Sequence, residues 1–514
     1  MPAPPACPAP EPYAHQPGSR RFAGVARLLR AGGGWRVGLV TLVALVALAS
    51  GFGAIAQAQG LPAEVEAALA RAKLPRDAVS VLVIEAQGAK APRISHRADV
   101  AMNPASVMKL VSTYAALDLL GPAYRWRTPV YLDGPVRNGV LMGNLIIQGQ
   151  GDPTLVAERL WLLMRRIRGL GIDRIQGDIV LDRGAFMLPP SDPGGFDGEP
   201  LRPYNAAPDA LLLNYKSVLM TFVVDSVNQV ARVQVNPPLA GVTIASSVPL
   251  SNTDCGDYRA ALRADFSDPT RIHFAGSYPA SCLERVWPVA FPDPASYAAR
   301  AVAGMWREVG GQLSGIVRDG PVPAGIGTST FELESPALAE VIRDINKYSN
   351  NVMAQQLFLS LSLPTSRSNG TNSPAGAATF EASREVLRTW WGKRFAGIAP
   401  PVLDNGSGLS RSDRVSAQAL GRLLQTAWQS PQMPELVASL PIVGVDGTLR
   451  RNRSLAVGSA HLKTGSLRDV VAVAGYVHAA NGRRYVLVAI ANHPNAGASR
   501  AAFDALLEWT LREP

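Results

Sequence analysis

The stretch His461-Leu-Lys-Thr-Gly-Ser-Leu467 ends a strand-like run near the C-terminus of the chain. Its tripeptide Lys463-Thr464-Gly465 is infrequent by chance, because the chain has only seven lysines against 43 arginines and composition limits how often a pattern recurs. The amine and the hydroxyl offer two polar contacts, and a glycine lets the backbone come close to a ligand. An ordinary exposed strand end would explain the tripeptide if it stood alone.

A serine and a lysine stand three positions apart far upstream, in Ser106-Val-Met-Lys109. Pro104 predicts the start of a helix over 105–120, which places both side chains on one helix face. Serine is a weak nucleophile that needs a neighbouring base, and lysine is such a base when burial and nearby cations lower its pKa. Roughly 0.5 such spacings are expected by chance at this composition, so the pair alone is weak.

A third polar motif, Ser349-Asn350-Asn351, lies in a segment of helical texture over 336–363, within or just before a helix. Taken alone it fits a helix N-cap equally well. In sequence order, however, the three motifs follow the pattern S-x-x-K, S-D-N and K-T-G that marks penicillin-binding proteins and serine β-lactamases. The first and the third are unchanged, and the second has Asn350 where aspartate is frequent.

With this set of motifs the sequence resembles the class C low-molecular-mass penicillin-binding proteins, the D-alanyl-D-alanine carboxypeptidase/endopeptidases. About 240 residues separate Ser106 from Ser349; this interval is far shorter in β-lactamases, and a large insertion here marks the class. Asn405 departs from the family's more frequent Asp-Gly-Ser-Gly. The resemblance covers the chain beyond residue 58, and these segments also support it: Gly149–Leu155, Asp404–Arg411, Val445–Leu449 and His461–Leu467.

The resemblance implies a role for each residue of the first two motifs. Ser106 attacks the carbonyl of the penultimate D-Ala, and Lys109 accepts the proton of the serine. Ser349 relays a proton to the leaving amine. Asn351 binds the substrate amide and Lys109.

The third motif completes the implied site. Lys463 and Thr464 bind the terminal carboxylate of the substrate, and Lys463 adds a positive potential that keeps Lys109 neutral. Gly465 lets the strand approach the substrate. The backbone N–H groups of Ser106 and Ser466 form the oxyanion hole, where the loss of one donor typically costs about 10²–10³ in rate.

Two further residues are candidates for the cleft. Arg411 would read a second substrate carboxylate, such as that of diaminopimelate, with a surface arginine as the alternative. Tyr204 would reach the cleft from the insertion. We expect neither a metal nor a cofactor, because six histidines and three cysteines leave little room for a metal centre.

The rest of the chain predicts an α/β (α+β) fold of the serine DD-peptidase / β-lactamase type, with an antiparallel sheet flanked by helices and a large β-rich insertion. The first strand and the last three are expected to share this sheet, with a hairpin turn at Asn481-Gly482. The predicted strands of the sheet are 78–85, 460–463, 470–478 and 484–491, and the predicted helices are 61–74, 105–120, 294–309, 336–363, 378–391, 415–429 and 503–511.

The predicted domain organisation follows from this pattern. Short strand-like runs begin at residue 128 and are separated by Gly, Pro and Asp, whereas helical texture returns after about residue 294. We therefore expect a leader over 1–58, a catalytic domain in two parts over 59–126 and 319–514, and a β-rich insertion over 127–318.

The N-terminal residues resemble an export signal. Five arginines and one glutamate within 1–56 account for +4 of the formal charge of +10. The uncharged run Val37–Ala56 follows, and Ala54-Ile-Ala56 and Ala56-Gln-Ala58 both fit a cleavage site. This order predicts a secretory signal peptide and a periplasmic protein; an uncleaved anchor is the alternative. Peripheral membrane association stays open.

Two cysteines remain beyond the leader, Cys255 and Cys282. In an oxidising compartment they are expected to form a disulfide, and two buried thiols are the alternative. The basic charge does not indicate a nucleic-acid partner, because no run of Arg and Lys with interleaved aromatic residues exists beyond the leader.

These observations predict a penicillin-sensitive serine D-Ala-D-Ala carboxypeptidase and/or endopeptidase. It acts on peptidoglycan stem peptides through an acyl-enzyme on Ser106, and β-lactams are its covalent inhibitors. Two alternatives remain. The first is a β-lactamase, which requires fast deacylation. The second is a non-catalytic peptidoglycan-binding relative that kept the fold.

Overall fold

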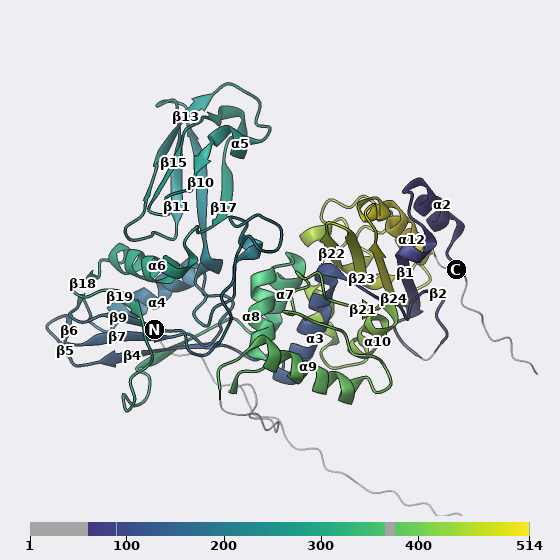
Figure 1. Cartoon of the computed structure of the whole chain (residues 1–514), viewed down its shortest axis with the longest axis horizontal. Coiled ribbons are helices and arrows are strands. Elements are labelled where there is room, and N and C mark those ends of the chain that lie inside the picture. The colour runs from purple at the N-terminus through teal and green to yellow at the C-terminus, as the bar shows by residue number, and fades with distance from the viewer. Residues whose placement is uncertain (1–59, 89, 365–375, 513–514) are drawn as a thin grey trace, which may run out of the picture. The chain divides into compact units, whose positions relative to one another are not determined.

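The computed structural model describes residues 60–88, 90–364 and 376–512 (Figure 1). These residues belong to one compact unit that spans 57–514. The predicted leader and most of the predicted loop over 364–377 lie outside the described residues. Among the residues that are described, no helix combines the length and the apolar character that a membrane crossing requires.

A five-stranded antiparallel sheet joins segments from the two ends of the described chain, in the order β2-β1-β24-β23-β22 (Figure 1). Val79 lies opposite Ala491 in its register, which confirms that the first strand and the last three share one sheet. The strands are β1 (Val79–Glu85), β2 (Ile94–His96), β22 (Ala460–Leu467), β23 (Val470–His478) and β24 (Arg484–Asn492).

Both faces of this sheet are buried, because its central strands are apolar at nearly every position. Val81 and Val83 point into a cluster with helices α2 and α12, whereas Leu82 points into the cluster on the opposite face, as the period of two requires. The helices are α2 (Ala63–Arg71), α3 (Lys109–Leu120), α7 (Leu338–Lys347), α8 (Asn351–Ser360), α9 (Phe380–Arg394), α10 (Ala417–Trp428), α11 (Met433–Ser439) and α12 (Arg500–Arg512).

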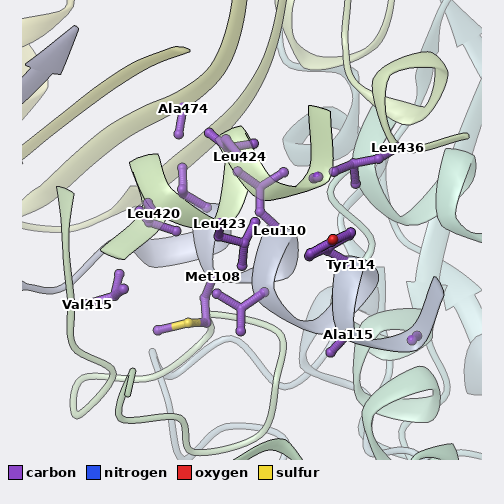
Figure 2. Close-up of a cluster of buried hydrophobic side chains, with 14 of the residues drawn as sticks. Met108, Leu110, Tyr114, Ala115, Val415, Leu420, Leu423, Leu424, Leu436 and Ala474 are labelled. Atoms are coloured by element: carbon purple, nitrogen blue, oxygen red, sulfur yellow. The ribbon is translucent and has the colours of Figure 1, made fainter. Parts of the chain in front are cut away.

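Helix α3 is held in the larger of these clusters, which Figure 2 shows in part. Leu110 and Tyr114 of α3 lie among Leu423 and Leu424 of α10 and Leu436 of α11 (Figure 2). Full burial of one such side chain contributes about 1.5–3 kcal/mol. The helix that carries Lys109 is therefore a rigid part of the core.

The middle of the chain contains two larger sheets and helices that pack on them. One sheet has the order β19-β9-β7-β4-β20 and the other β16-β13-β11-β10-β17. Their strands are β4 (Arg127–Asp133), β7 (Asn144–Gln148), β9 (Ile179–Asp182), β10 (Ser217–Asp225), β11 (Val230–Asn236), β13 (Ser247–Ser251), β16 (Tyr278–Pro279), β17 (Arg285–Ala290), β19 (Val317–Asp319) and β20 (Phe331–Glu334).

Most of the smaller elements lie in this region, whereas β3 and β21 pair with each other outside it. The remaining strands are β3 (Ala101–Met102), β5 (Val136–Arg137), β6 (Val140–Leu141), β8 (Arg174–Ile175), β12 (Thr243–Ile244), β14 (Ala264–Asp265), β15 (Arg271–Phe274), β18 (Gln312–Leu313) and β21 (Val415–Ser416), and the helices are α4 (Ala157–Gly169), α5 (Tyr258–Leu262) and α6 (Pro294–Glu308). Helix α4 was not predicted. The domain boundaries at 126 and 318 stay a prediction, and the middle sheet reaches Glu334.

Cys255 and Cys282 form the predicted disulfide. The bridge closes a loop with a sequence separation of 27, which corresponds to about 3–4 kcal/mol in the chain-entropy model. It lies in the middle region, next to α5 and β17, and holds together segments that have little regular structure of their own.

The helical segment predicted over 336–363 is broken into α7 and α8. Ser349 lies at the break with φ of +56°, a left-handed conformation that an α-helix does not contain. Asn350 then caps α8 through its side chain, which accepts a hydrogen bond from Met353 N. The N-cap interpretation of this motif is therefore confirmed, because a left-handed residue and a side-chain cap separate the two helices.

Candidate active site

Ser106 lies on a single 3₁₀ turn, Ala105–Met108, that leads directly into α3. Ala105 has φ of +47°, and a non-glycine residue in this region costs on the order of 1 kcal/mol and persists only where its surroundings fix it. Here Asn103 does so, since its Oδ1 accepts a hydrogen bond from Ala105 N at 2.9 Å. Asn103 in turn exchanges two hydrogen bonds with Asn492 of β24.

Lys109 is completely buried, and its Nζ has three polar neighbours. It lies 2.9 Å from Ser106 Oγ, 2.7 Å from Asn351 Oδ1 and 2.5 Å from the carbonyl oxygen of Ser407. The last two atoms only accept hydrogen bonds. A neutral amine that donates to both therefore directs its lone pair at the hydroxyl of Ser106.

The surroundings of Lys109 favour this neutral form. Burial holds the pKa of Lys109 well below its usual range, the charge of Lys463 lowers it further, and the charge of Asp413 acts in the opposite direction. A buried amine with a lowered pKa is a competent general base near neutral pH. The pair Ser106 and Lys109 thus has the geometry and the electrostatics of an activated nucleophile.

Asn351 connects this pair to the second motif and to the middle of the chain. It is the first residue of α8, and while its Oδ1 accepts from Lys109, its Nδ2 donates to the backbone oxygen of Tyr204 at 3.3 Å. Tyr204 itself donates through its hydroxyl to Asp197 Oδ2 at 2.9 Å. The predicted approach of Tyr204 to the site is therefore made by its backbone.

Lys463 and Ser349 form a second pair of amine and hydroxyl. Lys463 Nζ donates to Ser349 Oγ at 2.9 Å and to the backbone oxygen of Thr464 at 2.7 Å. Its side chain is fully buried, and this burial lowers the pKa of Lys463 to about 7. Ser349 has a left-handed conformation between α7 and α8, and its hydroxyl accepts this hydrogen bond from Lys463.

Glycine at 465 brings strand β22 against the turn that carries Ser106. A Cβ atom here would lie 2.4 Å from the backbone oxygen of Pro104 and 3.0 Å from Ser106 N. Both neighbours are backbone atoms that cannot move aside, so only glycine fits. The approach places the backbone of Ser106 beside that of Gly465 and Ser466, where the predicted oxyanion hole would form.

A cavity of about 500 Å³ opens over these groups. It is lined by Ser106 and Ser349 and by Thr464, Gly465 and Ser466. Thr448 also lines it, and its Oγ1 lies 2.8 Å from Thr464 Oγ1. The three motifs thus meet at one cavity, although Lys463 lies beneath its surface.

Arg411 differs from the other predicted residues, because it does not line this cavity. Its side chain is exposed, and its guanidinium carbon lies 4.9 Å from the centre of the Phe196 ring. This contact has the geometry of a cation–π interaction. A role of Arg411 toward a second carboxylate stays a prediction.

Two contributors to the site were missed by sequence reasoning. The backbone oxygen of Ser407 contacts Lys109, and the charge of the buried Asp413 acts on Lys109, while Asp413 Oδ1 accepts a hydrogen bond from Asp404 N at 2.8 Å. Burial raises the pKa of Asp413 to about 6. No local pattern marks either residue, since Asp413 follows Arg411 in a loop without periodicity.

Replacement of Asp413 by asparagine is expected to extend acylation of Ser106 to lower pH. The Asp413 carboxylate raises the pKa of Lys109, so its removal lets Lys109 lose its proton at a lower pH. The acidic limb of the pH–rate profile then shifts down, which stopped-flow measurements of penicillin acylation would record. An Asp254→Asn variant, altered at an exposed aspartate, is the control, and an unchanged limb in Asp413→Asn would contradict the prediction.

The described residues contain no group of three or more His, Cys, Asp or Glu side chains that would hold a metal ion.

Comparison with known proteins gives concordant matches. The family model described as D-Ala-D-Ala carboxypeptidase 3 (S13) matches residues 61–512. The D-alanyl-D-alanine carboxypeptidase DacB of Haemophilus influenzae is 25% identical over 406 residues, which cover 77% of this chain and 81% of that protein. The D-alanyl-D-alanine carboxypeptidase of Actinomadura sp. strain R39 is 28% identical over 441 residues, which cover 80% of this chain and 77% of that protein.

Solved structures agree in fold. The crystal structure of penicillin binding protein 4 (dacB) from Haemophilus influenzae has a TM-score of 0.67 at 23% identity and covers 86% of this chain and 99% of its own. The same protein complexed with a novel β-lactam has a TM-score of 0.64 at 22% identity, covering 87% and 100%. These likenesses confirm the predicted fold class.

Proposed function

Because the chain belongs to the D-Ala-D-Ala carboxypeptidase 3 (S13) family, we propose that it is a serine D-Ala-D-Ala carboxypeptidase and/or endopeptidase that acts on peptidoglycan stem peptides. The family predicted from the three motifs is confirmed by this match, and the named relatives are D-alanyl-D-alanine carboxypeptidases. The activity of this chain is a hydrolysis through an acyl-enzyme.

One observation carries the assignment of the nucleophile. Lys109 Nζ lies 2.9 Å from Ser106 Oγ while its two other contacts are to oxygens that only accept hydrogen bonds. Ser106 Oγ attacks the carbonyl carbon of the penultimate D-Ala and its proton passes to Lys109 Nζ. The oxyanion that forms lies between the backbone N–H groups of Ser106 and Ser466.

Collapse of this intermediate breaks the peptide bond and leaves an ester on Ser106. The leaving amine takes a proton through Ser349, whose hydroxyl is held by Lys463. Water then hydrolyses the ester and regenerates the free serine. Asn351 keeps Lys109 in place in both steps and offers its amide to the substrate, while Thr464 and Gly465 line the side of the cavity where the leaving group lies.

The same chemistry makes β-lactams covalent inhibitors. Their strained amide acylates Ser106 with no leaving amine to depart, so deacylation is slow and the adduct persists. A complex of the Haemophilus influenzae protein with a β-lactam supports this part of the proposal. A β-lactamase would instead turn the adduct over rapidly, which a measured adduct lifetime distinguishes.

We further propose that the protein works in the periplasm after export by its N-terminal signal. The disulfide between Cys255 and Cys282 supports an oxidising compartment, since such bridges are rare in the cytosol. The leader supplies the signal, and the basic balance beyond it suits an anionic surrounding.

Digestion of purified peptidoglycan tests the substrate class. Released D-Ala is expected from pentapeptide stems, and cross-linked dimers are expected to become monomers if endopeptidase activity is present. Separation of the muropeptides measures both at once. Enzyme pretreated with benzylpenicillin is the control, and identical digests with and without the pretreatment would contradict the proposal.

A further inference from the structure

The substrate of the proposed reaction has a free carboxylate on the residue that leaves, and a cation that lines the cavity would recognise that charge. The third-motif lysine is poorly placed to supply it. Lys463 is 0% exposed and does not line the cavity. Its amine already donates to Ser349 Oγ and to the Thr464 backbone oxygen.

Two other cations do line the cavity, on the side of Thr464 and Ser466. Arg500 is the first residue of α12, and Arg451 follows the segment that carries Thr448. Arg500 Nη2 donates to Ser466 Oγ at 3.4 Å. Its guanidinium therefore borders the same strand that would form the oxyanion hole and would face the leaving group of the substrate.

Neither arginine has an ionic partner within the described part of the chain, as judged from the ion pairs and hydrogen bonds that these residues form. Asp504 is the carboxylate that lines the cavity beside them, and its Oδ1 accepts a hydrogen bond from Asn452 Nδ2 at 2.9 Å. A guanidinium that lines a cavity and has no ionic partner is ready to bind a carboxylate, for which its planar fork is suited.

The stability of α12 does not explain an arginine at position 500. A cation in the first turn of a helix meets the positive end of the helix dipole and is unfavourable there. Residues placed against the needs of local structure are often retained for function. We therefore expect that Arg500 contributes to ligand binding in the cavity and does not stabilise α12.

We propose that Arg500 and Arg451 are the specificity-determining residues that receive the free carboxylate of the leaving D-amino acid, together with the hydroxyls of Thr464 and Ser466. The inference rests on the proposed function. In this proposal the two arginines that line the cavity bind the C-terminal carboxylate of the substrate. Lys463 instead holds the Ser349 hydroxyl and lowers the pKa of Lys109. The two arginines would also attract the carboxylate of a β-lactam.

The test compares an N-acylated L-Lys-D-Ala-D-Ala peptide with its C-terminal carboxamide. Wild-type enzyme is expected to prefer the acid, and Arg500→Gln is expected to reduce the ratio of kcat/KM for acid over amide by about 10- to 100-fold, because a hydrogen bond to a charged group is lost. The double variant R451Q/R500Q tests whether Arg451 still binds the carboxylate when Arg500 is absent. Arg450→Gln, an exposed neighbour outside the cavity, is the matched control.

The ratio of kcat/KM for acid over amide distinguishes a loss of specificity from a loss of folded protein. Both kcat/KM values are proportional to the fraction of active enzyme, so this fraction cancels in the ratio. Arg500→Lys keeps the charge and is expected to retain part of the preference. A double variant that keeps the wild-type ratio, or a wild-type enzyme that does not prefer the acid, overturns the inference while the proposed function stands. A wild-type enzyme without Ser106-dependent hydrolysis of either peptide overturns the proposed function itself.

Discussion

Replacement of Ser106 by alanine is expected to abolish covalent labelling by a fluorescent penicillin and to lower kcat/KM for D-Ala-D-Ala peptides by on the order of 10⁶. Ser106 Oγ is the cavity hydroxyl that lies beside the Lys109 amine, and Lys109 directs its lone pair at it, so the acyl-enzyme is expected on Ser106. Gel fluorescence and a peptidase assay measure the two effects.

The fold should tolerate this change. Ser106 is only half-buried and its hydroxyl contacts a single side chain, so the melting temperature is expected to stay close to that of the wild type. Ser95→Ala, at an exposed position of β2, controls for the loss of a hydroxyl elsewhere. Persistent labelling of a folded Ser106→Ala protein would show that the nucleophile is assigned to the wrong residue.

Replacement of Lys109 by glutamine is expected to slow acylation by about 10²–10⁴, the usual contribution of general-base catalysis. In the wild type the rate rises with pH as Lys109 loses its proton, because only the neutral amine accepts the proton of Ser106. An amide does not titrate. The acidic limb of the pH–rate profile is therefore expected to vanish in this variant, and rapid-quench measurements across pH would record it.

Two comparisons make the Lys109 result specific. Lys393→Gln makes the same substitution at an exposed position of α9 and is expected to leave the profile unchanged. Penicillin binding to Lys109→Gln followed by slow acylation would show an intact cavity. If the acidic limb survived in this variant, another group would have to be the base. The contact between Lys109 and Ser106 would then stabilise the fold without taking part in catalysis.

The motif residues could be predicted because their chemistry restricts their identity. A lysine cannot be exchanged for arginine where a proton must be accepted, and this made Lys109 and Lys463 visible in a chain with seven lysines. The shared sheet could be predicted as well, since its strands are long, apolar and bounded by turns. In both cases the local sequence pattern agrees with what the fold or the chemistry of the site requires.

Other features depend on contacts between residues that are distant in sequence. The break at Ser349 arises from a left-handed residue and from capping by Asn350, which compete with a strong apolar pattern. Asp413 and Arg500 become recognisable only when the fold brings them to Lys109 and to the cavity wall. Helix α4 could have been predicted, because its apolar positions Leu160, Met164 and Ile167 have helical spacing. It was missed although this signal is local.

The pairing of β1 with β24 also affects the order in which the active site folds. The centre of the sheet forms only when Val79 can pair with the strand of Ala491. The Ser106 turn depends on the same strand, because Asn103 is hydrogen-bonded to Asn492. Contacts of such long sequence range form late and slow the folding of a chain. The nascent chain therefore carries its nucleophile from early in synthesis, whereas the contacts that hold the nucleophile turn form only after the final strand has been made.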